Sequence, residues 1–149
     1  KIMATYYSNR SSSNGSHEIK GGFGMISDYC EVSVGTALVN NDIIKLFTLP
    51  KGARVIAMTV LGQGVQSGTD SVFDVGDSGD QDRIMGGQTT LRSSSYASYW
   101  WTIPTAKSAT TAPFHVYTAN TDIELKITTA GTGMTTGGKI VAGIIYFLE

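Results

Sequence analysis

The chain has 149 residues, of which 41% are hydrophobic and only 15% are charged, and its formal net charge is −1. This length suits one domain with a buried core, and the near-zero net charge excludes the basic surface that binds nucleic acid or an anionic membrane. Neither partner is therefore predicted. The single cysteine, Cys30, excludes an intrachain disulfide and fits assembly in a reducing cytoplasm. With no apolar signal-peptide core and no apolar run that would span a bilayer, a soluble, unsecreted chain is expected.

The first 27 residues differ in composition from the rest of the chain. The stretch from Ser8 to His17 is polar and has no apolar periodicity, so by itself it cannot offset the entropy of becoming ordered. We predict an extended N-terminal arm over residues 1–27 that orders by lying across a neighbouring protein, and a plain disordered terminus is the alternative. The isolated apolar anchors of this arm are Tyr6, Tyr7, Phe23 and Met25.

From residue 28 to residue 149 the hydrophobic pattern has a period of two, which is typical of β-strands. The residues 121–128 alternate without a fault, and the run 138–148 is almost continuously apolar, which predicts a central strand buried on both faces. The other predicted strands are Tyr29–Val34, Ile43–Leu49, Arg54–Leu61, Ser71–Val75, Arg83–Met85, Tyr99–Ile103 and Phe114–Thr118. Eight or nine short strands predict an all-β fold, an antiparallel β-sandwich of jelly-roll-like form.

One segment resembles a phosphate-binding loop. Residues 133–139 fit the pattern G-x-x-x-x-G-K, but Ile140 stands where a Ser or Thr is needed for magnesium. A strand also follows instead of the helix whose N-terminus would hold the phosphate. We predict that the segment is a loose hairpin between two strands.

A second segment is rich in carboxylates on a turning, glycine-containing backbone, which is a setting that calcium favours. Its spacing does not match a known calcium loop, and the neighbouring arginine can neutralise one acid. The main prediction is therefore a structural turn with no metal, and calcium is the alternative. The residues concerned are Asp74, Asp77, Asp80, Asp82 and Arg83.

A third cluster is aromatic and consists of Tyr96, Tyr99, Trp100 and Trp101. Aromatic pairs beside loops build interface hot spots and also sugar-stacking platforms. In a strand, however, alternate members point to opposite faces, so half of these side chains can belong to the core. We predict a subunit interface here, and a core cluster and a glycan platform remain open.

Catalytic motifs are absent from the sequence. His17 lies in the arm and His115 in a predicted strand, and neither has a Cys or carboxylate partner at a spacing that suits zinc. No nucleophile elbow and no recognisable carboxylate pair occurs. We predict that the chain is not an enzyme and has no cofactor.

Three segments in order look like a pattern found in small structural proteins of tailed bacteriophages. They are FTLPKGARV (47–55), FDVGDSGDQDR (73–83) and YTANTDIEL (117–125), the last leading into the apolar C-terminal strand. The likeness covers roughly residues 30–149 and resembles head decoration, or cement, proteins with a β-sandwich fold. It implies that the 74–83 loop is structural, with Asp and Arg side chains pinning neighbouring strands.

The resemblance further implies a virion protein on the capsid surface that is assembled in the host cytoplasm. Its partners would be the major capsid protein and further copies of itself, as a homotrimer that stabilises the capsid lattice. Under this interpretation the arm grips the capsid and the aromatic cluster lies between subunits. The alternative is a tail- or fibre-associated carbohydrate-binding module that uses Trp100 or Trp101 for host recognition.

Overall fold

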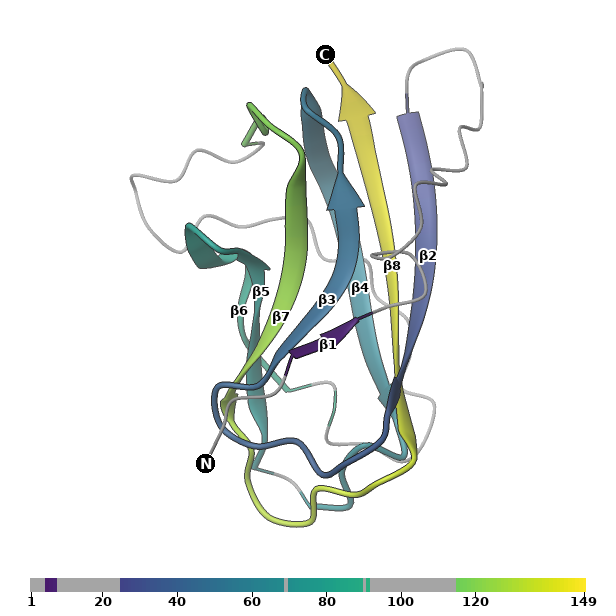
Figure 1. The fold of residues 1–149 in the computed structure, drawn as a ribbon, viewed down its shortest axis with the longest axis vertical. Coiled ribbons are helices and arrows are strands. Elements are labelled where there is room, and N and C mark those ends of the chain that lie inside the picture. Colours follow the sequence, from purple (N-terminus) through teal and green to yellow (C-terminus); the bar gives the residue numbers. More distant parts are fainter. Residues whose placement is uncertain (1–4, 8–24, 69, 90, 92–114) are drawn as a thin grey trace.

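A computed structural model describes residues 5–7, 25–68, 70–89, 91 and 115–149 (Figure 1). None of these residues is in an α-helix, and none belongs to a helix long and apolar enough to cross a membrane. The strands are β1 (Thr5–Tyr7), β2 (Met25–Val34), β3 (Ile43–Leu49), β4 (Ala53–Gln63), β5 (Val72–Asp77), β6 (Asp80–Gln88), β7 (Thr121–Thr129) and β8 (Gly138–Leu148).

These strands form two sheets. One has the order β1-β3-β7-β5-β6 and the other the order β2-β8-β4. All neighbouring strands run antiparallel except β1 and β3, which are parallel. The two sheets pack face to face around one core, which confirms the predicted all-β sandwich (Figure 1).

Side-chain alternation explains why these segments are strands. In β7, Ile123, Leu125 and Ile127 are fully buried, and the residues between them are polar and half-exposed. The same alternation in β2 and β3 directs apolar side chains from both sheets into the core. Burial of these faces is the main stabilising contribution to the sandwich.

The predicted ranges Ile43–Leu49 and Gly138–Leu148 are confirmed to the residue, and β4, β5 and β7 were found with small errors at their ends. β6 was predicted only over Arg83–Met85, although it extends from Asp80 to Gln88. β2 was predicted to begin at Tyr29, but it begins at Met25, because Met25 to Asp28 pair with Phe147 to Ile144 of β8. Residues 25–27, which the sequence assigns to the arm, are therefore strand residues. The predicted strand Phe114–Thr118 is wrong over its described residues, where Val116 forms only an isolated bridge with Arg54. The predicted strand Tyr99–Ile103 lies outside the described residues.

Two further expectations need correction. The loop 130–137 is not a hairpin, because β7 and β8 belong to different sheets and the loop carries the chain from one sheet to the other. β8 is the central strand of its sheet, as predicted, but it is not buried on both faces. Its inner side chains are buried, whereas Lys139 is exposed and Ile145 and Phe147 are half-exposed on the outer face. The outer side of β8 therefore presents partly exposed apolar side chains beside an exposed lysine.

Candidate interaction surfaces

The turn between β5 and β6 is organised by Asp77. Its buried carboxylate accepts hydrogen bonds from the backbone N–H groups of Gly79 (2.8 Å) and Asp80 (3.0 Å), which close the turn. It also pairs with Arg83, whose Nε lies 2.5 Å from Asp77 Oδ2. The buried carboxylate is thus supplied with charge-assisted hydrogen bonds from both backbone and side-chain donors.

Arg83 connects this turn to the chain that precedes β7. Its Nη1 lies 3.5 Å from His115 Nδ1, and the His115 ring meets Tyr117 edge-on with centroids 4.9 Å apart. Burial lowers the pKa of His115 below its ordinary value, and the positive charge of Arg83 lowers it further. The pKa of the buried Tyr117 hydroxyl is raised, chiefly by burial. The cluster therefore holds a neutral imidazole and a neutral phenol.

The carboxylates of the 74–83 segment do not converge on one point. Asp74 Oδ1 accepts a hydrogen bond from Gly87 N (2.7 Å), whereas Asp77 pairs with Arg83. Asp80 Oδ2 lies 3.8 Å from Arg83 Nη1. Among the described residues there is no group of three or more His, Cys, Asp or Glu that could hold a metal ion. These carboxylates thus make separate contacts along the hairpin.

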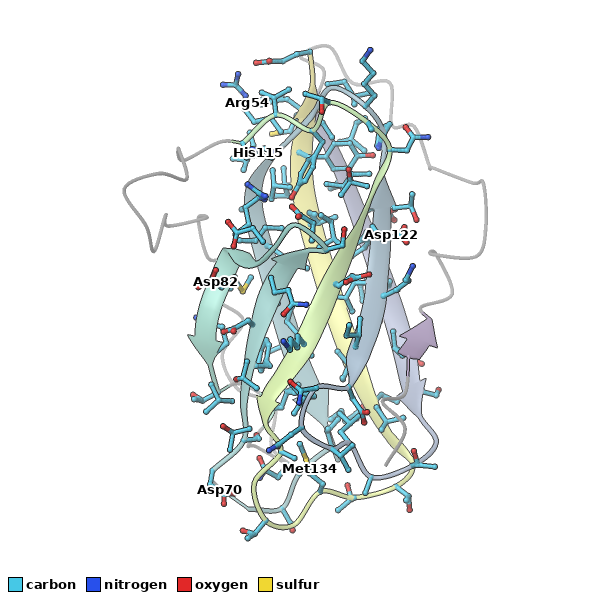
Figure 2. The ribbon with its side chains drawn as sticks, turned by 60° about the vertical axis from the view of Figure 1, so that its left-hand side comes forward. Arg54, Asp70, Asp82, His115, Asp122 and Met134 are labelled. Atoms are coloured by element: carbon cyan, nitrogen blue, oxygen red, sulfur yellow. The ribbon has the colours of Figure 1, made fainter. Side chains whose placement is uncertain are left out.

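At the opposite end of the sandwich lies the segment that resembles a phosphate loop. Figure 2 labels its Met134 close to Asp70, far from His115 and Arg54. Two N–H groups of this loop are already bonded to carbonyl oxygens, Thr135 N to Val65 O (3.0 Å) and Gly137 N to Val34 O (2.8 Å). The ammonium of Lys139 lies 2.8 Å from Glu31. These two N–H groups and the lysine ammonium, which a phosphate loop would offer to its ligand, are thus engaged within the fold.

The same end is held together by Asp70. Its Oδ1 accepts hydrogen bonds from Thr132 N (2.8 Å) and Gln66 Nε2 (3.0 Å). The hydrogen bond from Thr132 lowers the pKa of Asp70. Two loops far apart in the sequence, 64–71 and 130–137, are thereby fixed to each other.

The outer face of the five-stranded sheet is polar. Lys45 Nζ on β3 lies 2.6 Å from Asp122 Oδ2 and 3.9 Å from Glu124 Oε1 on β7. Asp122 also accepts a hydrogen bond from Thr48 Oγ1 (2.7 Å), and Figure 2 shows Asp122 on the side of the molecule away from Asp82. A face of this kind is well solvated.

The outer face of β2, β8 and β4 is apolar by comparison. Two large side chains on β2, Met25 and Tyr29, are 51% and 54% exposed. Phe147, which pairs with Met25, and Ile145 on β8 are half-exposed beside them. The sequence did not reveal that Tyr29 and Met25 share a face, because the predicted strand began at Tyr29 and Met25 was assigned to the arm. A strand that starts at Met25 puts Met25 and Tyr29 on one face.

The structure describes only some of the predicted site residues. Phe23 and the aromatic cluster Tyr96, Tyr99, Trp100 and Trp101 lie outside the described residues. The backbones of Tyr6 and Tyr7 belong to β1, where they pair with Ile44 and Lys45 of β3. Asp74, Asp77, Asp80 and Arg83 lie together at the β5–β6 hairpin, as does Asp82 on β6.

Two solved structures share this fold. A chain of the capsid of Ralstonia phage GP4 superposes with a TM-score of 0.77 at 14% identity, over 98% of this chain and 99% of that one. A chain of the cyanophage Pam1 capsid asymmetric unit superposes with a TM-score of 0.63 at 20% identity, over 95% and 97%. At these identities the likeness establishes the fold alone.

No protein-family model matches the chain, and no curated protein sequence matches it significantly.

Proposed function

We propose that this chain is a virion structural protein that binds the outside of an assembled phage capsid as a cement subunit. The observation that carries the proposal is the end-to-end correspondence with chains from two phage capsids, in which nearly all of each chain is covered. A shared fold does not by itself imply a shared function. Here, however, it agrees with the sequence resemblance to decoration proteins, which was found independently.

The proposed architecture is a jelly roll. Besides the eight strands, Val116 forms an antiparallel bridge with Arg54, and Tyr117 exchanges backbone hydrogen bonds with β4 and its preceding turn (Tyr117 N to Ala53 O, 2.9 Å; Gly52 N to Tyr117 O, 2.7 Å). In the segment that connects β6 to β7, the chain therefore pairs briefly with the edge of β4. If this pairing is included, every connection between consecutive strands from β1 to β8 crosses from one sheet to the other, except the β5–β6 hairpin. Such a topology favours a double-sheet jelly roll.

The proposed partners are the major capsid protein and two further copies of this chain. A capsid offers repeated sites around local three-fold axes, and a closed homotrimer can contact several shell subunits at once. Each contact can be weak, because linked contacts raise the effective concentration of the others. Stabilisation follows because the subunit binds the assembled lattice better than its dissociated parts. The arm anchors Tyr6, Tyr7 and Phe23 extend this grip, and Met25 adds to it from the exposed face of β2.

The proposal assigns no catalytic step, cofactor or metal to the chain. The carboxylates at the β5–β6 hairpin act structurally, and the neutral His115 and Tyr117 pack against each other and Arg83. The proposed location is the capsid surface of the virion, after assembly in the host cytoplasm.

Co-sedimentation with capsids tests this function. Capsids stripped of the protein are mixed with the purified chain and pelleted, and the temperature at which they release DNA is measured with and without it. We expect saturable binding and a higher release temperature. No binding to stripped capsids, together with binding to a panel of bacterial surface polysaccharides, would replace this proposal with the host-recognition alternative.

A further inference from the structure

The edge of the five-stranded sheet is formed by β1, which has only three residues. β1 pairs with the start of β3, Thr5 with Ile43 and Tyr7 with Lys45, and this is the one parallel pairing between the described strands (Figure 1). Parallel pairing is slightly less stable per residue than antiparallel pairing, and so short a pair contributes few hydrogen bonds. Among the eight described strands, β1 is therefore the one whose pairing is most easily exchanged.

The edge of β3 that β1 covers has to be covered by some strand. Ile44, Leu46 and Leu49 of β3 are fully buried, so β3 is fixed in the sheet by the core. Without a strand beside residues 43–45, the backbone N–H and C=O groups on this side would be open to pairing with another chain. This edge is therefore an acceptor site for an extended strand.

The chain between β1 and β2 is long enough for β1 to reach another molecule. It comprises the 17 residues 8–24, nine of which are Ser or Gly, a composition typical of linkers. Fully extended, 17 residues span at most about 56–61 Å. The radius of gyration of a domain of this length is only about 15 Å. The length of this connection therefore does not restrict β1 to the β3 edge of its own chain.

We propose that, when copies of this chain assemble, β1 of each copy pairs with β3 of the adjacent copy in the register seen here within one chain. The same backbone hydrogen bonds form in both arrangements, so only the connection between the strands changes. The inference rests on the proposed function and specifies it, because it names the protein that the start of the arm lies across as the adjacent copy in the cement trimer.

The geometry of this contact leads to a closed ring. Each copy offers one β1 and one β3 edge, so the contact joins two different surfaces, and such contacts form rings when the rotation between copies closes. In a closed ring every β3 edge is covered, whereas an open chain of copies leaves one uncovered. Copies held side by side on a capsid also have a high effective concentration for one another, which favours the exchange.

Disulfide cross-linking of the full-length chain in solution, without capsids, tests the inference. The double variant Thr5→Cys/Ile43→Cys puts two thiols at paired positions of β1 and β3, and Ile43 is only half-buried, so the variant is expected to fold. Neighbouring strands lie about 4.8 Å apart, within the Cα separation that a disulfide bridges. After mild oxidation we expect a covalent product of about three times the 15.8 kDa of the chain on a non-reducing gel, which reduction returns to the single-chain mass.

The matched control is Thr5→Cys/Thr48→Cys. Thr48 is an exposed residue of the same strand, but it lies roughly 16 Å beyond the residue that pairs with Thr5, too far for a disulfide. The control should therefore show only the background of the wild type, whose single cysteine, Cys30, is buried. Circular dichroism verifies that all three proteins are folded.

Two results would overturn the inference. One is a disulfide in Thr5→Cys/Ile43→Cys that closes only within single chains, recognised as a monomer whose new cysteines resist alkylation. The other is the absence of any cross-linked product above the control. Because no capsid is present, a later failure to bind capsids would contradict only the proposed function.

Discussion

Arg83 Nε and Asp77 Oδ2 lie 2.5 Å apart, and this pair closes the β5–β6 hairpin with both side chains largely removed from solvent, at 17% and 7% exposure. Removing one partner of such a pair leaves the other charge buried and uncompensated. Asp77 would retain its two backbone donors, Gly79 N and Asp80 N, which reduce the penalty.

We therefore expect Arg83→Met to lower the free energy of unfolding by about 2–4 kcal/mol. Urea denaturation followed by intrinsic fluorescence measures this loss. Arg54→Met is the control, because the Arg54–Glu149 pair is more exposed and should contribute only about 0–1 kcal/mol. Equal losses in the two variants would contradict the structural role given to Asp77 and Arg83.

The pH dependence of stability should carry a contribution from His115. Its pKa in the folded chain is lowered by burial and by Arg83, so the unfolded chain binds a proton more readily. The stability that neutral His115 provides is therefore complete above its ordinary pKa of about 6.5 and declines as the pH falls through that value.

Unfolding free energies of the wild type and His115→Gln, measured from about pH 8 to pH 5, isolate this contribution. The difference between the two proteins should be constant at the alkaline end and should shift against the wild type below about pH 6.5. A pH-independent difference would show that the folded and unfolded states protonate His115 equally.

Gly76 should tolerate no side chain. A Cβ at this position would meet the backbone of Asp80, Gln81 and Arg83 across the hairpin, and backbone atoms cannot yield as the end of a side chain can. We expect Gly76→Ala to destabilise the fold by about 1–3 kcal/mol. Gly35→Ala is the matched control, since a Cβ there would meet nothing within 4 Å. Its effect on thermal unfolding should be within about 0.5 kcal/mol, and a similar effect at both positions would contradict the packing around Gly76.

Cys30 is fully buried in β2, so its thiol should react only when the fold opens. With an aromatic disulfide reagent we expect labelling of the native chain to be slower than that of the urea-unfolded chain by roughly a thousandfold or more, in line with ordinary domain stability. Rapid labelling without denaturant would mean that β2 detaches from β8 independently of the rest of the sandwich.

The sheet strands were predictable where burial alternates along one segment. Ile123, Leu125 and Ile127 alternate with charged residues, so the local pattern alone identifies β7 and its inner face. β1 was not predictable in this way, because its three residues are fixed by parallel pairing with β3, a contact that the local sequence does not encode.

The candidate surfaces likewise include features that were predictable from the sequence and features that were not. The Asp77–Arg83 pair lies within one hairpin, so proximity in the sequence was enough to suggest it. The apolar face was missed, because its existence depends on β2 beginning at Met25 and on β8 being its neighbour. Once that register is known, the period of two puts Met25 and Tyr29 on the outer side. Sequence alone also placed the 130–137 loop within a hairpin, since it does not reveal which sheet a strand joins.

The most direct test of the central claim is an averaged cryo-electron density map of the phage particle that carries this protein. We predict that the eight-stranded sandwich fits density on the outside of the capsid shell, in contact with the major capsid protein and grouped around local three-fold positions. Capsid surface density that is fully accounted for without this chain, or density for the sandwich only on the tail or its fibres, would contradict the account.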